Sequence, residues 1–379
     1  RSGQGGLLPG LFKQIVVPEA AFAGDEWLDR RTFLASLRTE LLQAQTLETW
    51  RRNPQVHCDA AVDAIFDLVV RNAGNLSRVL PAIESRLAAL PDFLAAGAEC
   101  VRLPVPLWTK LAEQSCQGAV GFLQGIAPEL AAISSTPART RRLVRAAERA
   151  FADYASAIGR RRQGPACGYS IGRANFEFLM RERLGFDYSL PEAAANGRRL
   201  VAQMTELLEQ EAARLGGGTA REILEKAAAA WTPGRPLLDA YRDATSAIRK
   251  RLARLGIATL PRDESLQILP APPFLQHQFP TAAYNGPQPF AKANAGIFWV
   301  NDLSLSQTHP ERKRAEIRQH FGLELTSVHE AYPGHHLQFA IQNRHPSMLR
   351  RLAGHSIYYE GWTMWCEKLA VERGLVNNP

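Results

Sequence analysis

Cysteine is scarce in this sequence, and the cysteines that are present form no recognisable pattern. The chain of 379 residues has five of them, at positions 58, 100, 116, 167 and 366. No pair has the C-x-x-C spacing of a thiolate zinc site, and an odd, scattered set excludes a dense disulfide scaffold. This usage favours a reducing compartment, with the cytoplasm as the first expectation. We expect Cys366 to be a small buried apolar residue rather than a nucleophile.

Long hydrophobic runs are also missing. No apolar segment reaches the roughly 18 residues of a membrane-spanning helix, so we expect no membrane span. The hydrophobic content of 46% is still enough for a sizeable core in a chain of this length. Apolar residues recur at three- and four-residue spacing, with charges between them, over 25–51, 138–162, 192–215 and 237–255. The sequence therefore predicts a mainly α protein with a large helical body.

The positive charge of the chain has no nucleic-acid motif beside it. The formal net charge is +8, and arginines cluster at 141–142 and 160–162. These arginines are interleaved with acids and alanines along predicted helices, and no recognition motif accompanies them. We therefore expect no nucleic-acid partner, although a basic surface can attract acidic substrates.

A proline-rich stretch over residues 261–289 is the clearest boundary in the chain. It divides a helical N-terminal part, residues 1–260, from a part over 261–379 in which the candidate catalytic residues gather. We interpret the stretch as a surface connector, with a substrate-gating loop as the alternative. Residues 296–301 follow it and read as a short β-strand in an otherwise helical chain.

The segment His329-Glu330-Ala331-Tyr332-Pro333-Gly334-His335-His336 contains the strongest candidate site. In the zinc-binding pattern H-E-x-x-H, histidines four residues apart share one helix face. Here His335 follows His329 by six residues, about 240° around a regular helix, so the two rings would not meet. Pro333 removes a helical hydrogen bond and Gly334 tolerates unusual backbone angles. A two-residue bulge, of the π type, would return His335 to the equivalent of i+4.

A hydrolytic zinc site needs a third protein ligand and an open position for water. Glu360 is the nearest candidate, 25 residues after His335, which leaves room for a turn and a second helix packed antiparallel to the first. We assign His329, His335 and Glu360 as ligands of Zn²⁺ and Glu330 as the general base that activates a zinc-bound water. His336 remains the alternative to His335. Glu367 is either a hydrogen-bonding support for the site or a surface carboxylate.

For several residues near these ligands, the sequence is compatible with either a functional or a structural role. The predicted strand could offer a free edge to an extended substrate, with Gly296, Phe298 and also His336 as substrate-binding residues, or it could be a buried core strand. Tyr359 is a candidate catalytic phenol beside Glu360, able to donate to a developing oxyanion. Aromatic packing beneath the helix pair is the alternative for Tyr359 and for its neighbour Tyr358.

Residues 329–338 together with 360–367 resemble the paired signature of the "domain of unknown function 885" family, as do residues 171–180 and 296–301. That family is similar to gluzincin-type zinc metallopeptidases, and the likeness covers roughly residues 20–379. Trp365 stands where the family usually has tyrosine. Because family members usually continue through another helical segment with further active-site residues, the resemblance implies that a second chain or a longer form of this one supplies it.

The motif and the resemblance together predict a zinc-dependent hydrolase. The resemblance implies that its substrates are peptide or amide bonds. One alternative keeps the metal but has a specialised amidohydrolase acting on a small metabolite. Another is a non-catalytic helical interaction protein with a vestigial metal site.

Overall fold

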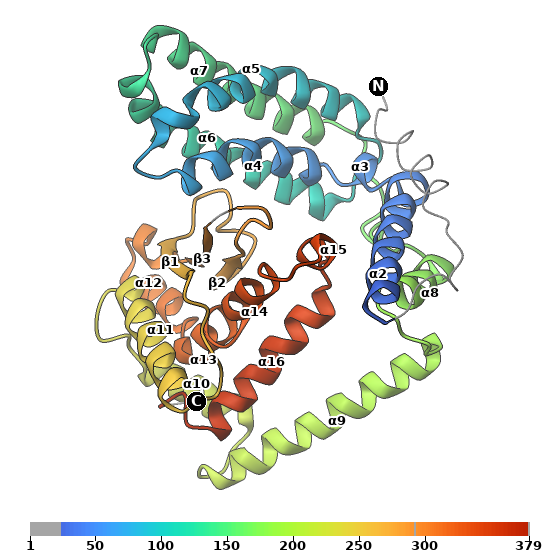
Figure 1. Ribbon diagram of the computed structural model, residues 1–379, viewed down its shortest axis with the longest axis vertical. Helices are drawn as coiled ribbons and strands as arrows, with labels where there is room; N and C mark the ends of the chain where they lie inside the picture. Colours follow the sequence, from blue (N-terminus) through green and yellow to red (C-terminus); the bar gives the residue numbers. More distant parts are fainter. Residues whose placement is uncertain (1–23, 292, 378–379) are drawn as a thin grey trace. The chain divides into compact units, whose positions relative to one another are not determined.

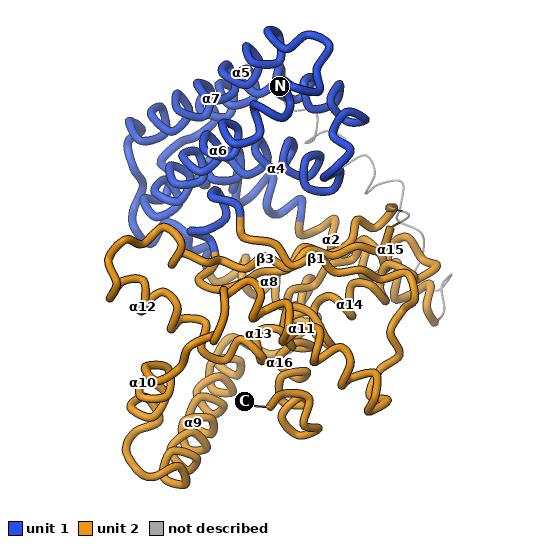
Figure 2. Tube along the Cα trace, turned by 90° about the vertical axis from the view of Figure 1, so that its left-hand side faces the viewer, with its two compact units in different colours: residues 1–11, 40–172, 272–278 blue, residues 12–39, 173–271, 279–379 orange. Residues whose placement is uncertain are grey.

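The structure, a computed structural model, describes residues 24–291 and 293–377. Within these residues it is mainly helical with one small sheet, as predicted (Figure 1). No helix in these ranges combines the length and the apolar character needed to cross a membrane. The chain divides into two compact units, coloured separately in Figure 2.

The first unit consists of residues 1–11, 40–172 and 272–278, of which the structure describes those from 40 onwards. Its helices are α3 (Thr49–Arg52), α4 (Gln55–Arg71), α5 (Leu76–Cys100), α6 (Pro106–Ile133) and α7 (Pro137–Gly159), preceded by a π-helical turn, η2 (Leu42–Leu47). Phe274, from the proline-rich stretch, is fully buried between Phe66 and Phe122, with ring centroids 5.0 and 5.8 Å away. This part of the stretch therefore fills a core and is not a free loop.

The second unit consists of residues 12–39, 173–271 and 279–379, of which the structure describes those from 24 onwards. It begins with α2 (Gly24–Leu41), α8 (Arg173–Glu182), α9 (Leu190–Arg214), α10 (Ala220–Ala230) and α11 (Leu237–Arg254). After the sheet come η3 (Leu303–Ser306), α12 (Pro310–Arg318), α13 (Leu323–Glu330), α14 (His335–Gln342), α15 (Met348–Leu352) and α16 (Ser356–Glu372). The boundary between the units differs from the one predicted at residue 260. Helices α8 to α11, which precede residue 260, belong to the same unit as the sheet and the C-terminal helices.

The sheet has three strands in the order β1-β3-β2. β1 (Glu264–Pro270) pairs with β3 (Asn294–Val300) in parallel, and β2 (Ala282–Asn285) pairs with β3 antiparallel. The predicted strand is therefore present, but it lies in the centre with partners on both sides. This corrects the expectation of a free edge for substrate at that strand.

The core of the second unit joins the sheet to the helices that carry the candidate site. Phe298 of β3 and Cys366 of α16 are both fully buried in this core, together with Val328 of α13 and Tyr241 of α11. Cys366 is thus the small buried residue that its sequence context predicts. Since α13, α14 and α16 lie side by side (Figure 1), residues 329–336 and residue 360 come from neighbouring helices.

Candidate metal centre

The helix that begins at Leu323 stops at Glu330, and α14 begins at His335. Across the interruption the Gly334 amide donates to the Val328 carbonyl (3.0 Å) and the Leu337 amide donates to the Ala331 carbonyl (3.3 Å). Both bonds reach back six residues instead of the four of a regular helix, so two extra residues are accommodated. The prediction that two residues are inserted relative to a regular helix is therefore confirmed. The expectation of one continuous, bulged helix is wrong, because the chain forms two helices joined by a non-helical turn.

Gly334 makes this turn sterically possible. A Cβ atom at this position would lie 1.9 Å from the His329 carbonyl oxygen and 2.3 Å from that of Val328. Pro333 precedes it in a cis peptide with Tyr332. The Pro333 carbonyl accepts a hydrogen bond from the Trp362 indole of α16 at 3.0 Å. The turn is therefore fastened to the helix that carries Glu360.

The turn brings His329, His335 and Glu360 together, with one possible ligand atom from each lying within 4.8 Å of the others. The Nε2 atoms of His329 and His335 lie 3.4 and 3.7 Å from the two carboxylate oxygens of Glu360. Two ligand atoms bound to one tetrahedral zinc at about 2.1 Å are about 3.4 Å apart, so these separations suit such an ion. The donor set, two imidazoles and a carboxylate, is also one that zinc accepts in catalytic sites.

Glu367 holds one of these imidazoles in place. Its Oε1 lies 2.7 Å from Nδ1 of His329, which leaves Nε2 directed to Glu360. Burial by itself would lower the pKa of His329, but the hydrogen bond that Nδ1 donates to Glu367 and the nearby carboxylates of Glu330 and Glu360 raise it above its usual value. Of the two interpretations of Glu367, the structure therefore has the hydrogen-bonded one. Such carboxylate partners orient metal-binding histidines.

The environment of His335 favours a neutral ring. Burial, aided by the positive charge of His329, lowers the pKa of His335 to about 4. A neutral imidazole is the form that binds a metal. Tyr284 of β2 stacks on the ring, with centroids 6.2 Å apart and planes at 15°. Nδ1 of His335 has no hydrogen-bond partner within the described ranges.

Glu330 is the last residue of α13 and follows His329 directly. Its exposed fraction is only 9%. Burial raises its pKa to about 7; the charge of His329 works against this rise, and Glu360 and Glu367 add to it. A carboxyl group that titrates near neutral pH can both accept and return a proton.

His336 does not face a substrate, which corrects that prediction. Its side chain is fully buried, with Nε2 2.7 Å from Glu264 of β1 and Nδ1 3.0 Å from the Tyr284 hydroxyl. Because both nitrogens have these partners, His335 and not His336 joins the candidate ligands. Gly296 of β3 leaves the necessary space, since a Cβ there would lie 2.3 Å from the Tyr284 hydroxyl and 2.6 Å from Nδ1 of His336.

Two more residues predicted to act on the substrate, Phe298 and Tyr359, instead take part in packing and hydrogen bonding within the protein. Phe298 is fully buried, with its ring 5.5 Å from that of Tyr241, so it is not available to a substrate. Tyr359 donates its hydroxyl hydrogen to the Ala353 carbonyl at 2.9 Å and lies with its ring 4.5 Å from Phe339. The phenol predicted as an oxyanion donor is therefore already bonded to the backbone, and the packing interpretation is the correct one.

A family model described as "Bacterial protein of unknown function (DUF885)" matches residues 12–379. The chain belongs to this family. No curated protein matches it. Two solved structures share the fold of this DUF885 chain at low sequence identity. One is "a putative lipoprotein of unknown function from Shewanella oneidensis", with 17% identity, a TM-score of 0.65, and coverage of 97% of this chain and 70% of that one. The other is "the putative lipoprotein from Colwellia psychrerythraea", with 17% identity, a TM-score of 0.51, and coverage of 78% of this chain and 55% of that one.

Two residues beside the candidate metal centre, Glu264 and Tyr284, were not predicted from the sequence. Glu264 accepts hydrogen bonds from Tyr332 (2.7 Å) and Arg249 (2.7 Å) besides His336. Burial would raise the pKa of Glu264, but these three hydrogen bonds outweigh it and lower the pKa to about 2. Both residues lie within the proline-rich stretch, far from the motif in sequence, and no spacing pattern connects them to it.

Proposed function

We propose that this chain is a zinc-dependent hydrolase of peptide or amide bonds, of the gluzincin type. The observation that carries the proposal is the convergence of two imidazoles and a carboxylate from α13, α14 and α16, with the buried Glu330 directly beside the first histidine. Hydrolytic zinc sites have three protein ligands and one position left open for water or substrate. The three side chains would supply this number and kind of ligand.

The protein side chains would divide the chemistry in a simple way. Bound by His329, His335 and Glu360, zinc would polarise a carbonyl group and lower the pKa of water at its open position. Glu330 would take the proton of the attacking water and deliver it to the leaving amine, for which a pKa near 7 is suitable. The hydrogen bond that His329 donates to Glu367 would hold the imidazole in one orientation throughout.

The exposure of the ligands supports access for a substrate. The Glu360 side chain is 59% exposed, whereas those of His329 and His335 are 23% and 11% exposed. The candidate metal position is therefore closed on the side of α13 and α14 and open toward solvent beside Glu360. A site of this shape admits water and substrate, whereas a purely structural zinc is enclosed by four protein ligands.

The test is the variant Glu330→Gln, assayed with panels of peptides and acylated amines with and without a chelator. We expect kcat to fall by about 10²–10⁴-fold, the loss typical of removing a general base, while the zinc content stays near that of the wild type. Glu311→Gln is the matched control, because Glu311 is an exposed carboxylate in the first turn of α12. Activity that survives in Glu330→Gln, or that a chelator leaves unchanged, would rule out this mechanism.

A further inference from the structure

A cavity of about 750 Å³ lies within the second unit, and none of the candidate metal ligands lines it. Helices α2, α14, α15 and α16 and the turn after α8 form its walls. Three of its large lining residues, Leu28, Ile341 and Tyr358, are 47%, 52% and 56% exposed. The walls therefore present apolar surface to water. A ligand with an apolar body would bury this surface on binding.

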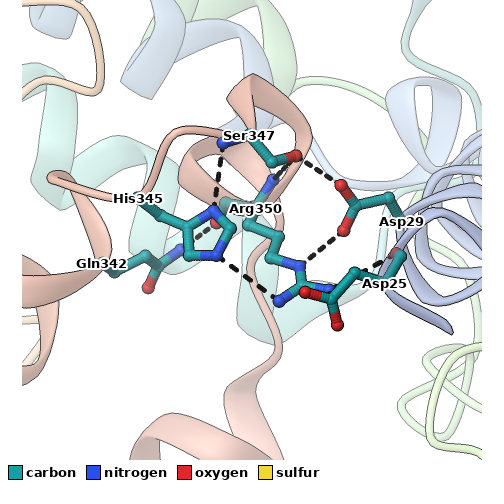
Figure 3. Close-up of polar contacts among 6 residues, drawn as sticks. All are labelled: Asp25, Asp29, Gln342, His345, Ser347 and Arg350. Carbon is teal, nitrogen blue, oxygen red and sulfur yellow. Dashed lines mark hydrogen bonds and ion pairs between the residues drawn. The ribbon is translucent and has the colours of Figure 1, made fainter.

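Both acidic side chains of the lining already have basic partners. Arg350 donates through Nε to Oδ1 of Asp29 (2.5 Å), and Ser347 donates through Oγ to Oδ2 of the same carboxylate (2.5 Å), as Figure 3 shows. The second acid, Glu182, accepts a hydrogen bond from Arg38 of α2 at 2.6 Å. These contacts neutralise both acids and also Arg350, which is itself one of the lining arginines.

The two other arginines of the lining, Arg31 and Arg183, leave it with an excess of positive charge. The guanidinium of Arg31 lies over the Trp27 ring, 5.3 Å from its centroid. The Arg183 side chain has no hydrogen bond or ion pair within residues 24–291 and 293–377, since only its backbone carbonyl is bonded, to His355. Arg31 is exposed and Arg183 is partly exposed, so both remain accessible to a ligand.

The charge of Arg183 acts at the cavity wall. Burial raises the pKa of Tyr359, which lines the cavity, and the positive charge of Arg183 opposes this rise. The lining histidines do not compete for an anion, because Nδ1 of His345 accepts from the Ser347 amide (3.1 Å) and Nε2 of His355 is bonded to the Arg183 carbonyl. Arg183 is therefore the cation best placed to bind an anionic group. A guanidinium binds a carboxylate through two parallel hydrogen bonds.

We propose that this cavity binds an apolar molecule that carries one carboxylate, and that Arg183 pairs with the carboxylate while the apolar lining contacts the rest of the molecule. Arg31 adds positive potential at the same site. Two sources supply this chemistry, a fatty acid and the C-terminus of a peptide with apolar last residues. The proposal does not depend on the proposed hydrolase function, because the cavity contains no candidate metal ligand.

The experiment compares two matched pairs of probes, octanoate with octanamide and N-acetyl-Leu-Phe with its C-terminal amide. Binding is measured by calorimetry to Glu330→Gln protein, so that no probe is turned over. We expect the acid of at least one pair to bind about tenfold more tightly than its amide, the effect of hydrogen bonds to a charged group. The acid that binds more tightly identifies the source.

Adding Arg183→Gln should reduce the preference for the acid to less than about threefold, because the cation that pairs with the carboxylate is gone. Arg181→Gln is the matched control, since Arg181 is an exposed arginine in the last turn of α8 and lies outside the lining. This control should keep the full preference. Equal binding of acid and amide, no binding of any probe, or a preference that survives Arg183→Gln would overturn the proposal.

A measurement without a substitution at Arg183 covers the case in which that variant does not fold. Raising the salt concentration from about 0.05 M to about 0.5 M should reduce the preference for the acid at least about threefold, because the pair is partly exposed and salt screens it. Binding of the amide should not weaken. A preference that salt leaves unchanged would contradict the ion pair. Failure of the proposed function would be seen separately, as an absence of chelator-sensitive hydrolysis by the wild type.

Discussion

The variant Gly334→Ala tests whether the turn between α13 and α14 assembles the candidate metal centre. The new Cβ would lie 1.9 Å from the His329 carbonyl oxygen, whereas real Cβ contacts essentially never fall under 3.0 Å. The backbone must therefore move by about 1 Å or more at a position between two candidate ligands. The same Cβ would lie 2.3 Å from the Val328 carbonyl oxygen. Rotating a side chain cannot relieve either contact, because both oxygens belong to the backbone.

The size of the effect follows from the tolerance of metal coordination. Ligand distances are kept within about 0.2 Å, so a displacement of about 1 Å removes His329 or His335 from the coordination sphere. We expect zinc affinity to fall at least about 100-fold and the free energy of unfolding of the metal-free protein to fall by about 2–3 kcal/mol. Competition with a chromophoric chelator measures the zinc affinity, and urea denaturation measures the unfolding.

Gly361→Ala is the matched control on the neighbouring helix. Gly361 follows Glu360 in α16, and a Cβ there would meet nothing within 4 Å. Replacing glycine by alanine inside a helix should stabilise the protein by up to about 1 kcal/mol and leave zinc affinity unchanged. If Gly334→Ala binds zinc as tightly as Gly361→Ala, then the turn does not position the ligands as described.

Three further predictions concern single carboxylates. Glu367→Ala should lower zinc affinity about 10–100-fold, measured by the same chelator competition, because the ring of His329 loses its hydrogen-bond partner; unchanged affinity would show that the bond does not matter. Glu264→Gln should lower the free energy of unfolding by about 3 kcal/mol at pH 7. Since the pKa of Glu264 is lowered to about 2, this deficit should shrink as pH falls below about 4.5, and a deficit independent of pH would contradict the assignment. Burial, with a contribution from the charge of Asp63, raises the pKa of Asp59 to about 6, so its ionisation opposes folding at neutral pH. Asp59→Asn should therefore stabilise the protein by up to about 3 kcal/mol at pH 7, with the gain disappearing as pH falls from about 6 to about 4; a gain that persists at pH 4 would contradict this cause.

The candidate ligands could be predicted from the sequence because their arrangement depends on local geometry. The spacing of His329 and His335 does not fit a regular helix, and only an insertion near Pro333 and Gly334 reconciles it with a shared ion. The structure has two extra residues at that turn. Helical content likewise follows from periodicity, which reads neighbours three and four residues apart.

The remaining assignments were decided by contacts between segments distant in the sequence. Glu264 is 72 residues from its hydrogen-bond partner His336, and Tyr284 is 52 residues from it. Which of several polar groups a side chain meets depends on the register of the sheet and on how the helices pack against it, and neither quantity appears in the local pattern. For the same reason Tyr359 could not be assigned from its position beside Glu360. The sequence by itself thus determined which residues are candidate metal ligands. The tertiary structure decided which of their neighbours have hydrogen-bonding groups left for a substrate, because a buried polar group must first satisfy its own hydrogen bonds.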